Sequence, residues 1–334
     1  MILVKLLLSE TVGVFVIAEA GSNFYNGLDE TVDRRFSRAV GLIEAAAWAG
    51  ANAVKFQAYS SAGTYVGGAG SYGELGGINK LFDEIALPKP WLPKLAAACE
   101  GNKIELMVSV FSLEDLQAVD PFVKRHKIAS YEMGFLELIE AAMATGKEVL
   151  VSTGGHSGSE ITEMVWKFKQ DLKNGQRLKL LHCMASYPTS LMDANLNCIP
   201  DYLDGYSDHT EDIVIGPVMA VAMGAFYIEK HFTLSRNMKG PDHRFALSVE
   251  QLKQMISAIR QAETMIGVTR PEGSVFPCEQ ALRNFAVRHV QATRDLAMGD
   301  VLSKENIGVL RPGSRPRGEH ALQYKTILCS VASR

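Results

Sequence analysis

The chain has 334 residues, of which 47% are hydrophobic, 21% are charged and 8% are aromatic. Its 34 lysines and arginines nearly balance 37 aspartates and glutamates, so the net charge is −3. This composition is that of a globular protein and excludes a collagen, a coiled coil and a disordered chain. The near-neutral balance gives no electrostatic reason to expect nucleic acid or an anionic membrane as a partner.

The sequence also indicates where the protein works. Its longest apolar runs are shorter than the roughly 20 residues that cross a bilayer, and residues 1–13 lack the cleavage site of a signal peptide. The five cysteines are scattered and form no CxxC pair. We therefore expect a cytoplasmic protein that acts on small molecules, without a disulfide framework.

Short apolar runs rich in β-branched residues alternate with longer helical patterns. The clearest helices are predicted at 31–49, 157–173, 214–223 and 248–266. Strands are predicted at 14–18, 53–57, 105–110, 126–130, 148–152, 178–183, 204–207 and 226–232. This βα alternation predicts the α/β class and, by its length, a (β/α)8 or TIM barrel. A doubly wound sheet is less favoured because no GxGxxG follows the first strand.

Three segments divide the predicted chain. Residues 1–266 form the barrel, residues 267–284 with two prolines and two glycines are a linker, and residues 285–334 are a small second unit. Region 59–79 holds seven glycines, and we interpret it as a flexible loop over the barrel mouth.

Polar residues stand at nearly every predicted strand end, which is where barrel enzymes place their active sites. Charged side chains inside apolar strands are costly to bury unless they are paired or liganded. We therefore treat these positions as one candidate site. They include Glu19, Lys55, Gln57, Ser109, Lys127, Ser130, Glu132, Ser152, Ser186, Tyr187, Ser207 and Glu229.

Two histidines, His209 and His231, follow consecutive strands, so their imidazoles can converge on one ion. Two neutral imidazoles with open positions suit a catalytic divalent metal rather than a closed structural zinc site. Asp208 or Asp242 is a candidate for orienting a ligand or a water. His182 is equally compatible with a core histidine.

Lysines 55, 127 and 230 are predicted to bring three positive charges to the same rim, beside serine hydroxyls. Fixed cations and hydroxyl donors suit a small anion that carries a phosphate and a carboxylate. A barrel lysine, Lys55 or Lys127, can alternatively form a Schiff base, as in class I aldolases. The sequence leaves both readings open.

Several motifs together resemble the sialic acid synthase (N-acetylneuraminate synthase) family, which includes spore coat polysaccharide biosynthesis proteins. In the barrel they are IAEAGSN (17–23), AGANAVKFQ (49–57), HKIAS (126–130), STGG (152–155), GYSDHT (205–210), GAFYIEKHFT (224–233) and NMKGPDH (237–243). KENIGVLRPG (304–313) is similar to the family's antifreeze-like (SAF) domain. The resemblance covers nearly the whole chain.

The resemblance implies condensation of phosphoenolpyruvate with an N-acetylmannosamine-type aldose, which gives a nine-carbon 2-keto sugar acid and phosphate for surface polysaccharides. It also implies a divalent cation, Mn²⁺ or Mg²⁺, and a homodimer whose C-terminal domain caps the partner's barrel. By the resemblance, His209 and His231 bind the metal, and Glu19, Glu132 and Asp242 are catalytic. The substrate-binding residues it implies are Lys55, Gln57, Ser109, Lys127, Ser152, Ser186, Tyr187, Ser207 and Arg311.

The chain departs from the family pattern mainly on the sugar side. The family's NHNG is NFYNG here, with Phe24 where a histidine is expected, and its STPF is VSVF at 108–111. Ser186 replaces a frequent asparagine. The SAF segment reads RPGSRPRG, which adds Arg315 and Arg317, and is shorter than the family pattern predicts. The sequence therefore leaves the aldose open among a free, a 6-phosphorylated and a diacetamido sugar. A homologue that binds a sugar without turning it over is the remaining alternative.

Overall fold

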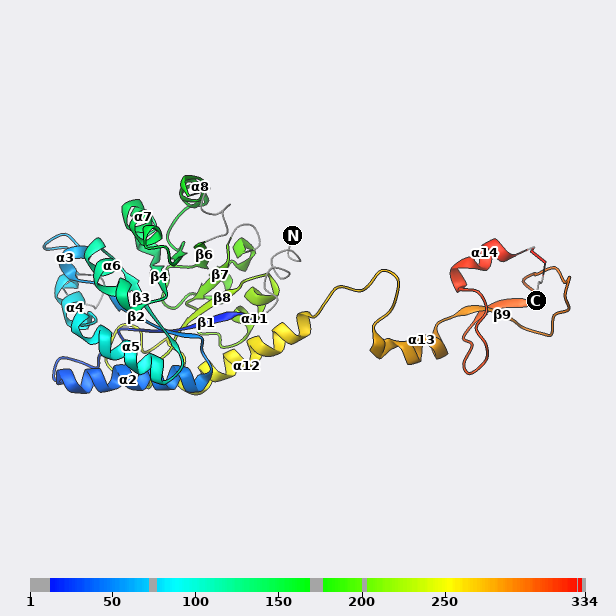
Figure 1. Cartoon of the computed structure of the whole chain (residues 1–334), viewed down its shortest axis with the longest axis horizontal. Coiled ribbons are helices and arrows are strands. Elements are labelled where there is room, and N and C mark those ends of the chain that lie inside the picture. Colours follow the sequence, from blue (N-terminus) through cyan, green and yellow to red (C-terminus); the bar gives the residue numbers. More distant parts are fainter. Residues whose placement is uncertain (1–12, 72–76, 169–176, 200–202, 329, 332–334) are drawn as a thin grey trace. The chain divides into compact units, whose positions relative to one another are not determined.

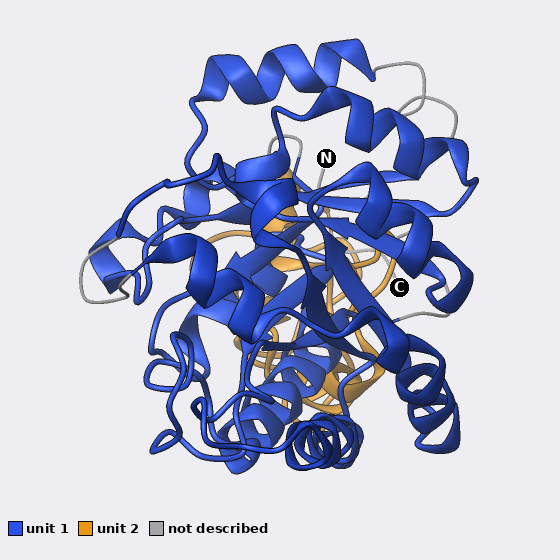
Figure 2. Cartoon of the chain, turned by 90° about the vertical axis from the view of Figure 1, so that its left-hand side faces the viewer, with its two compact units in different colours: residues 1–266 blue, residues 267–334 orange. Residues whose placement is uncertain are grey.

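The computed structural model describes residues 13–71, 77–168, 177–199, 203–328 and 330–331. The chain divides into two compact units, Met1–Ile266 and Gly267–Arg334, which Figure 2 colours blue and orange. Among the described residues, no helix is both long enough and apolar enough to cross a bilayer.

Eight parallel strands close into a barrel in the first unit, in the order β1 to β8 (Figure 1). They are β1 Phe15–Gly21, β2 Ala53–Ala58, β3 Glu105–Val110, β4 Arg125–Ile128, β5 Glu148–Ser152, β6 Leu178–Cys183, β7 Gly205–Asp208 and β8 Tyr227–His231. Each predicted strand is present to within a few residues. The predicted (β/α)8 barrel is confirmed.

Helices follow the strands and cover the outside of the barrel (Figure 1). They are α2 Val32–Ala49, α3 Ser61–Thr64, α4 Ile78–Ile85, α5 Leu92–Gly101, α6 Leu113–Val119, α7 Leu136–Ala144, α8 Gly158–Lys167, α11 Ile215–Ala222 and α12 Val249–Ile266. The Thr31 side chain caps the first turn of α2, and Gly50 ends that helix in the left-handed conformation at φ 91°. The helix predicted at 157–173 ends at Lys167, and residues 169–173 lie outside the described residues.

The strands alternate between two environments along their length. Residues on the outer face, such as Val16, Val54 and Ile228, pack with the helices in the largest apolar cluster. Inside the barrel, the amino-terminal half is filled by a separate cluster. Its buried members are Phe15, Ile17, Ala53, Met107, Leu150, Leu181 and Tyr227. Because side chains alternate with a period of two, the inward positions two residues further along line the mouth.

The glycine-rich segment 59–79 is not a continuous loop. It contains the short helix α3, and α4 begins at Ile78, while residues 72–76 lie outside the described residues. Tyr59, Phe82 and Phe111 pack together beside the segment, with ring centroids 4.6 and 5.2 Å from Tyr59. Whether the segment closes over the mouth stays a prediction.

The second unit contains a two-stranded antiparallel sheet of β9, His289–Ala292, and β10, Ile307–Leu310. Two short helices accompany it, α13 Gln280–Ala286 and α14 Tyr324–Ile327. Helix α13 begins inside the predicted linker 267–284 and ends beyond it, because Gln280–Ala286 has no proline or glycine to interrupt it. Assignment of 285–334 to a SAF domain stays a prediction.

Candidate active site

Two lysines lie inside the barrel mouth, each directed toward a serine of the next strand. Lys55 Nζ on β2 donates to Ser109 Oγ at 2.9 Å, and Lys127 Nζ on β4 donates to Ser152 Oγ at 2.7 Å. Both lysines are almost fully buried, 3% and 1% exposed. The strand register places these partners together, since Lys55 pairs with Met107, two residues before Ser109, and Lys127 pairs with Leu150, two residues before Ser152.

Two carboxylates share this floor with the lysines. Glu19 Oε2 on β1 lies 2.8 Å from Lys55 Nζ, and Gln57 Nε2 donates to Glu19 Oε1 at 2.6 Å. Glu229 on β8 lies 3.7 Å from Lys55 and 3.8 Å from Lys127. The mouth therefore contains two ammonium groups and two carboxylates in alternation, inside a barrel whose lower half is apolar.

Burial and pairing shift the pKa of each of these groups. Burial raises the pKa of the Glu19 carboxyl, against the attraction of Lys55. Burial acts in the same sense on Glu229, but Lys127 and Lys55 outweigh it and hold the Glu229 pKa below its usual value. Burial lowers the pKa of Lys127, whereas Glu19 and Glu229 keep the pKa of Lys55 above its usual value despite burial.

The two predicted metal ligands do converge. The ring centroids of His209 and His231 are 5.4 Å apart, and both side chains are buried. His209 Nδ1 lies 2.8 Å from the carbonyl oxygen of Met184, so its proton is directed there and Nε2 keeps its lone pair. Buried His231 Nδ1 makes no hydrogen bond in the described chain and lies 3.6 Å from Asp242 Oδ2.

This pair fits a divalent cation held by few protein ligands. An unpartnered buried ring nitrogen is costly, and a metal or a bound molecule at His231 relieves that cost. Among the residues that the structure describes, no group of three or more His, Cys, Asp or Glu side chains forms a metal site. The two imidazoles therefore suit a cation whose other positions are taken by water or substrate.

Two further carboxyl groups at the mouth titrate near neutrality. Burial raises the pKa of Glu132 from 4.5 to about 7, opposed by Lys127, and Glu132 Oε2 is buried without a hydrogen-bond partner in the described chain. Burial, with Glu19 adding to it, raises the pKa of Asp242 from 3.8 to about 7. A carboxyl group with a pKa near 7 can both hold and release a proton at neutral pH.

An aromatic wall stands beside the histidines. The Tyr187 ring lies 4.2 Å from the His209 ring and 5.8 Å from that of Phe245, which itself packs 5.1 Å from His231. Tyr187 remains 40% exposed, so one face is open to a ligand. Ser186 is exposed, and its hydroxyl donates to the Pro188 carbonyl rather than to this cluster.

The structure corrects the prediction for Lys230 and Asp208. Lys230 does not join Lys55 and Lys127 at the rim: its Nζ donates to Asp208 Oδ2 and to the Thr210 carbonyl, each at 2.6 Å. Asp208 consequently does not orient a metal ligand. Both residues lie one position from the inward histidines, and alternation turns them to the outer face of β7 and β8.

His182 also lies outside the site. Its Nε2 is 2.7 Å from the Ala194 carbonyl and its ring stacks on Tyr206 at 5.6 Å, as expected of a core histidine. Phe24, the residue in place of the family's histidine, is 1% exposed and packs against Phe56 and Trp91. That substitution therefore extends the core behind the barrel wall.

Sequence reasoning gave no role to Glu229 and did not single out Cys183. Cys183 is buried on β6, accepts a hydrogen bond from Ser130 Oγ at 3.3 Å, and lies 3.7 Å from His209 Nδ1. Both residues occupy inward positions of their strands, like the lysines. Alternation along each strand identifies the inward positions at its carboxyl end, and both residues occupy such positions.

Arg311 belongs to the second unit, where it follows β10 and is exposed. Its predicted contact with a sugar stays a prediction. In that same unit Arg317 Nη1 donates to Asn284 Oδ1 at 2.9 Å, which ties the arginine-rich turn to α13.

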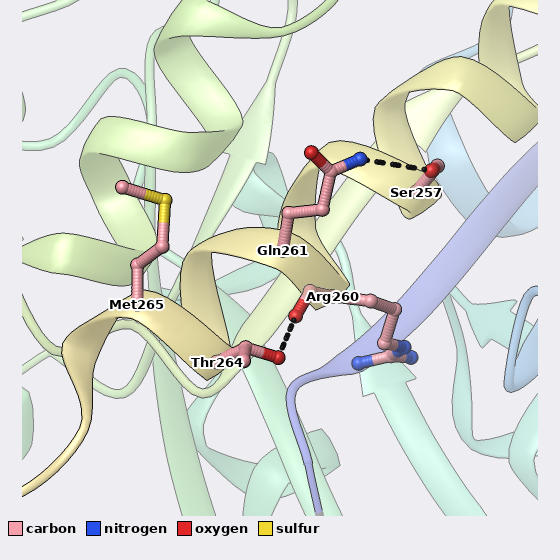
Figure 3. Close-up of a pocket in the computed structure, with 5 residues that line it drawn as sticks. All are labelled: Ser257, Arg260, Gln261, Thr264 and Met265. Carbon is pink, nitrogen blue, oxygen red and sulfur yellow. Dashed lines mark hydrogen bonds between the residues drawn. The ribbon is translucent and has the colours of Figure 1, made fainter. Parts of the chain in front are cut away.

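The hollow drawn in Figure 3 is not part of this site. It has a volume of about 420 Å³ and is lined by Ser257, Arg260, Gln261, Thr264 and Met265 of α12. Arg260 Nη1 donates to the carbonyl of Val14, which precedes β1. The hollow therefore lies at the amino-terminal end of the barrel, opposite the mouth.

These observations first define a class. A (β/α)8 barrel whose mouth combines two buried lysines, serine hydroxyls, two adjacent imidazoles and carboxyl groups that titrate near neutrality is built to bind and transform a small anion. Comparison with known proteins then identifies the family. The NeuB family model matches residues 42–270, and the chain belongs to this family. The predicted relationship to sialic acid synthases is confirmed.

Individual relatives agree with this membership. The spore coat polysaccharide biosynthesis protein SpsE of Bacillus subtilis is 34% identical over 97% of this chain and 91% of its own length. A pseudaminic acid synthase of Campylobacter jejuni is 31% identical over 96% and 93% of the two chains. A crystal structure of N-acetylneuraminic acid synthetase from Leptospira borgpetersenii superimposes with a TM-score of 0.69 at 32% identity, covering 82% of this chain and 92% of the other.

Proposed function

We propose that the chain is a synthase that condenses phosphoenolpyruvate with an amino-sugar aldose in surface polysaccharide biosynthesis. The products are a nine-carbon, sialic-acid-like 2-keto sugar acid and inorganic phosphate. One observation carries this proposal: Lys55 and Lys127, each bonded to a serine hydroxyl, lie in the barrel mouth that also contains His209 and His231. The names of the relatives, which include synthases of pseudaminic and N-acetylneuraminic acid, support the reaction class.

The floor of the mouth would bind phosphoenolpyruvate. Two ammonium groups and the hydroxyls of Ser109 and Ser152 replace the water around a phosphate and a carboxylate. The Ser207 hydroxyl, which was predicted to join them, donates to Glu229 Oε1 in the structure. Holding the substrate there orients its methylene carbon toward the aldehyde carbon of an open-chain sugar, which lowers the entropic cost of forming the carbon–carbon bond. As this bond forms, the aldehyde oxygen takes up a proton, and the cation left at the carbon bearing the phosphate is captured by water. The bond from that carbon to the phosphate oxygen then breaks while the new hydroxyl loses its proton, which gives the 2-keto group and inorganic phosphate.

The water that attacks this cation must lose a proton, and carboxyl groups at the mouth are placed to accept it. Glu132 and Asp242, with pKa values raised to about 7 by burial, can exchange protons at neutral pH. Glu19, hydrogen-bonded to Gln57, is a third candidate. We propose these three as the catalytic carboxyl groups, with Gln57 and Tyr187 contacting the sugar.

His209 and His231 would hold the divalent cation, Mn²⁺ or Mg²⁺, that the family resemblance implies. Such a cation supplies polarisation of the sugar's aldehyde oxygen. Around it, the Met184 carbonyl accepts the proton of His209 Nδ1, while His231 Nδ1, 3.6 Å from Asp242 and without a hydrogen bond in the described chain, is a ring nitrogen left for a ligand. A hydrogen-bond acceptor on one ring nitrogen orients an imidazole ligand and raises its affinity for the metal.

We further propose that the enzyme is a homodimer in which a SAF-like second unit caps the partner's barrel, with Arg311 contacting the sugar. The motif KENIGVLRPG at 304–313 supports this. The aldose is a free, a 6-phosphorylated or a diacetamido N-acetylmannosamine-type sugar, since the departures from the family pattern lie on the sugar side.

Phosphate release from phosphoenolpyruvate, measured with Mn²⁺ across a panel of aldoses, tests the proposal. The panel contains N-acetylmannosamine, its 6-phosphate, diacetamido hexoses, arabinose 5-phosphate and erythrose 4-phosphate. Release with one of the first three supports the proposal and identifies the sugar. Release only with the pentose or tetrose phosphate contradicts it and indicates a different condensing enzyme.

A Schiff-base aldolase is the second candidate, because burial lowers the pKa of Lys127, as a nucleophilic lysine requires. Borohydride in the presence of pyruvate would then attach the substrate covalently to the chain, which mass spectrometry detects. We expect no adduct with the wild type and loss of turnover with a chelator. An adduct that Lys127→Met abolishes would replace the proposed mechanism.

A further inference from the structure

Glu229 is the charged residue in the mouth that the proposed chemistry leaves without a role. It lies on β8, is 4% exposed, and extends into the barrel between lysines that belong to β2 and β4. Its Oε1 accepts a hydrogen bond from Ser207 Oγ at 2.9 Å. Its Oε2 is buried and accepts no hydrogen bond within the described part of the chain.

The distances from Glu229 to the two lysines are nearly equal, 3.7 Å to Lys55 and 3.8 Å to Lys127. Hydrogen bonds between nitrogen and oxygen span about 2.7–3.2 Å, so neither lysine donates an N–H group to this carboxylate. The attraction between full charges remains strong at this distance, because the surroundings are buried. Glu229 thus neutralises both ammonium groups from a distance.

The lysines keep donors for a ligand as a result. An ammonium group has three N–H donors. Within the described chain, Lys55 donates to Ser109 and forms an ion pair with Glu19 at 2.8 Å, which occupies a second donor at most. Lys127 donates to Ser152 and to the Ile128 carbonyl. One donor on each lysine is therefore left for an anionic substrate.

Lys127 depends on Glu229 more than Lys55 does. Lys55 has a second carboxylate, Glu19, at 2.8 Å, whereas among the described residues Glu229 is the ion-pair partner of Lys127 within 4.0 Å. A buried ammonium group without a counter-ion is strongly disfavoured and gives up its proton. Removal of the Glu229 charge would therefore leave Lys127 neutral in the free enzyme.

We infer that Glu229 is a positioning residue for the phosphoenolpyruvate site, which holds Lys55 and Lys127 as a pair of ammonium groups while leaving their remaining N–H donors to the substrate. This inference rests on the proposed function. A core ion pair with a purely structural role is the competing explanation, and it predicts loss of stability without a change in substrate binding.

The other charged and titratable groups around this cluster come from four strands and from the segments that follow four strands. Facing Glu229 or Lys127 are Glu19 on β1, Lys55 on β2, Cys183 on β6, and His231 on β8, with Glu132 after β4, Tyr187 after β6 and His209 after β7. Asp242, after β8, faces Glu19, His209 and Lys55. Of these, Lys55 and Glu19 already pair with each other. None of the neighbouring carboxylates lies within 4.0 Å of Lys127 in the described chain, so none substitutes for Glu229.

Calorimetric titration of the full-length, Mn²⁺-loaded enzyme with phosphoenolpyruvate at pH 8 tests this role. Titrations in two buffers with different heats of ionisation report the protons taken up. For Glu229→Gln, which keeps the size of the side chain and an acceptor for Ser207, we expect at least about tenfold weaker binding. Because Lys127 must regain its proton when the anion binds, we also expect about one additional proton taken up per substrate bound.

Two further variants keep the test decisive. Glu229→Asp retains the charge and should bind the substrate without additional proton uptake, even if the shorter side chain lowers affinity. Glu105→Gln is the matched control, because Glu105 pairs with Arg125 at 2.7 Å at the opposite end of the same barrel. We expect wild-type substrate binding from this control, with lower thermal stability.

Steady-state kinetics distinguish an effect on phosphoenolpyruvate binding from an effect on sugar binding. Glu229→Gln should raise the KM for phosphoenolpyruvate about tenfold and change the KM for the sugar less than twofold. Wild-type affinity with no additional proton uptake in a folded Glu229→Gln variant would overturn the inference while leaving the proposed function intact. Failure of the wild type itself to bind phosphoenolpyruvate would instead contradict the proposed function.

Discussion

The two faces of strands β7 and β8 carry buried charged groups that differ in how completely they are hydrogen-bonded. On the outer face, Lys230 Nζ donates to Asp208 and twice to Thr210, and Asp208 Oδ1 accepts from Tyr206 and from the Thr210 amide. All three donors of this lysine are used. On the inner face, one position away, Glu229 Oε2 and His231 Nδ1 are buried without hydrogen bonds in the described chain.

The difference separates structural from functional charge. In a closed network such as that of Lys230, every N–H donor of the lysine already has an acceptor, so none is left to bind a ligand. The inner face stays incomplete, with spare lysine donors, an unpartnered imidazole nitrogen and carboxyl groups that titrate near 7. Incomplete polar groups of this kind are costly in an empty site and become favourable when substrate or metal completes them.

The largest expected effect lies on the inner face. His209→Ala and His231→Ala should each weaken Mn²⁺ binding and lower phosphate release by at least about 100-fold. Loss of a residue that only supports a metal ligand already costs about 10–100-fold, and loss of a ligand itself should cost no less. Phosphate release and electron paramagnetic resonance of free Mn²⁺ measure the two quantities. His182→Ala is the matched control, since His182 lies on the outer face and should keep both. Normal turnover in either inner variant would contradict the metal assignment.

The outer network should govern stability instead. Asp208→Asn leaves the Lys230 ammonium buried without its counter-ion, which costs about 3–5 kcal/mol of the free energy of unfolding. Urea denaturation measures this loss. The double variant Asp208→Asn, Lys230→Met should recover part of it, because both charges are then removed together. If Asp208→Asn inactivates the enzyme without lowering its stability, the assignment of the two faces is wrong.

Glu132 should make stability depend on pH in a predictable direction. Burial raises its pKa from 4.5 to about 7, so the folded state binds this proton more tightly than the unfolded chain. The resulting stabilisation is present below about pH 4.5 and is lost as the pH rises through 7. Relative to Glu132→Gln, the wild type should therefore lose about 3 kcal/mol between pH 4.5 and 8.

Thermal denaturation of both proteins across this pH range measures the difference. A constant difference between the wild type and Glu132→Gln across this range would show that Glu132 is not held protonated by burial, and would remove it as a proton carrier near neutrality.

The smallest expected effect concerns the second unit. Arg311→Ala should raise the KM for the sugar about tenfold, roughly 1.4 kcal/mol, with little change in the KM for phosphoenolpyruvate. Steady-state kinetics with each substrate varied in turn measure the two values. Arg288→Ala is the control, since its guanidinium donates to the Val309 carbonyl within that unit. Equal increases for both substrates would show that Arg311 does not contact the sugar.

Much of the fold was predictable because strand and helix patterns are local. The eight strands, the helices at 31–49, 214–223 and 248–266, and the pairing of His209 with His231 follow from periodicity and from the rule that barrel sites lie at strand ends. The helix at Gln280–Ala286 was missed because neighbouring prolines and glycines made that segment resemble a linker. Phe24 could not be assigned to the core, since its neighbours Phe56 and Trp91 are distant in the sequence.

By itself, the sequence determined which strands exist, which chemical groups stand at their ends, and to which family the chain belongs. Apart from the pairing of His209 with His231, only the tertiary structure decided which of those groups meet. Lys230 and Glu229 are adjacent in sequence and equally charged in magnitude, yet one completes a network outside the barrel and the other stands between two lysines inside it. The reason is physical: strand alternation separates neighbours onto opposite faces, and barrel closure brings side chains from β2, β4 and β8 within ion-pair distance.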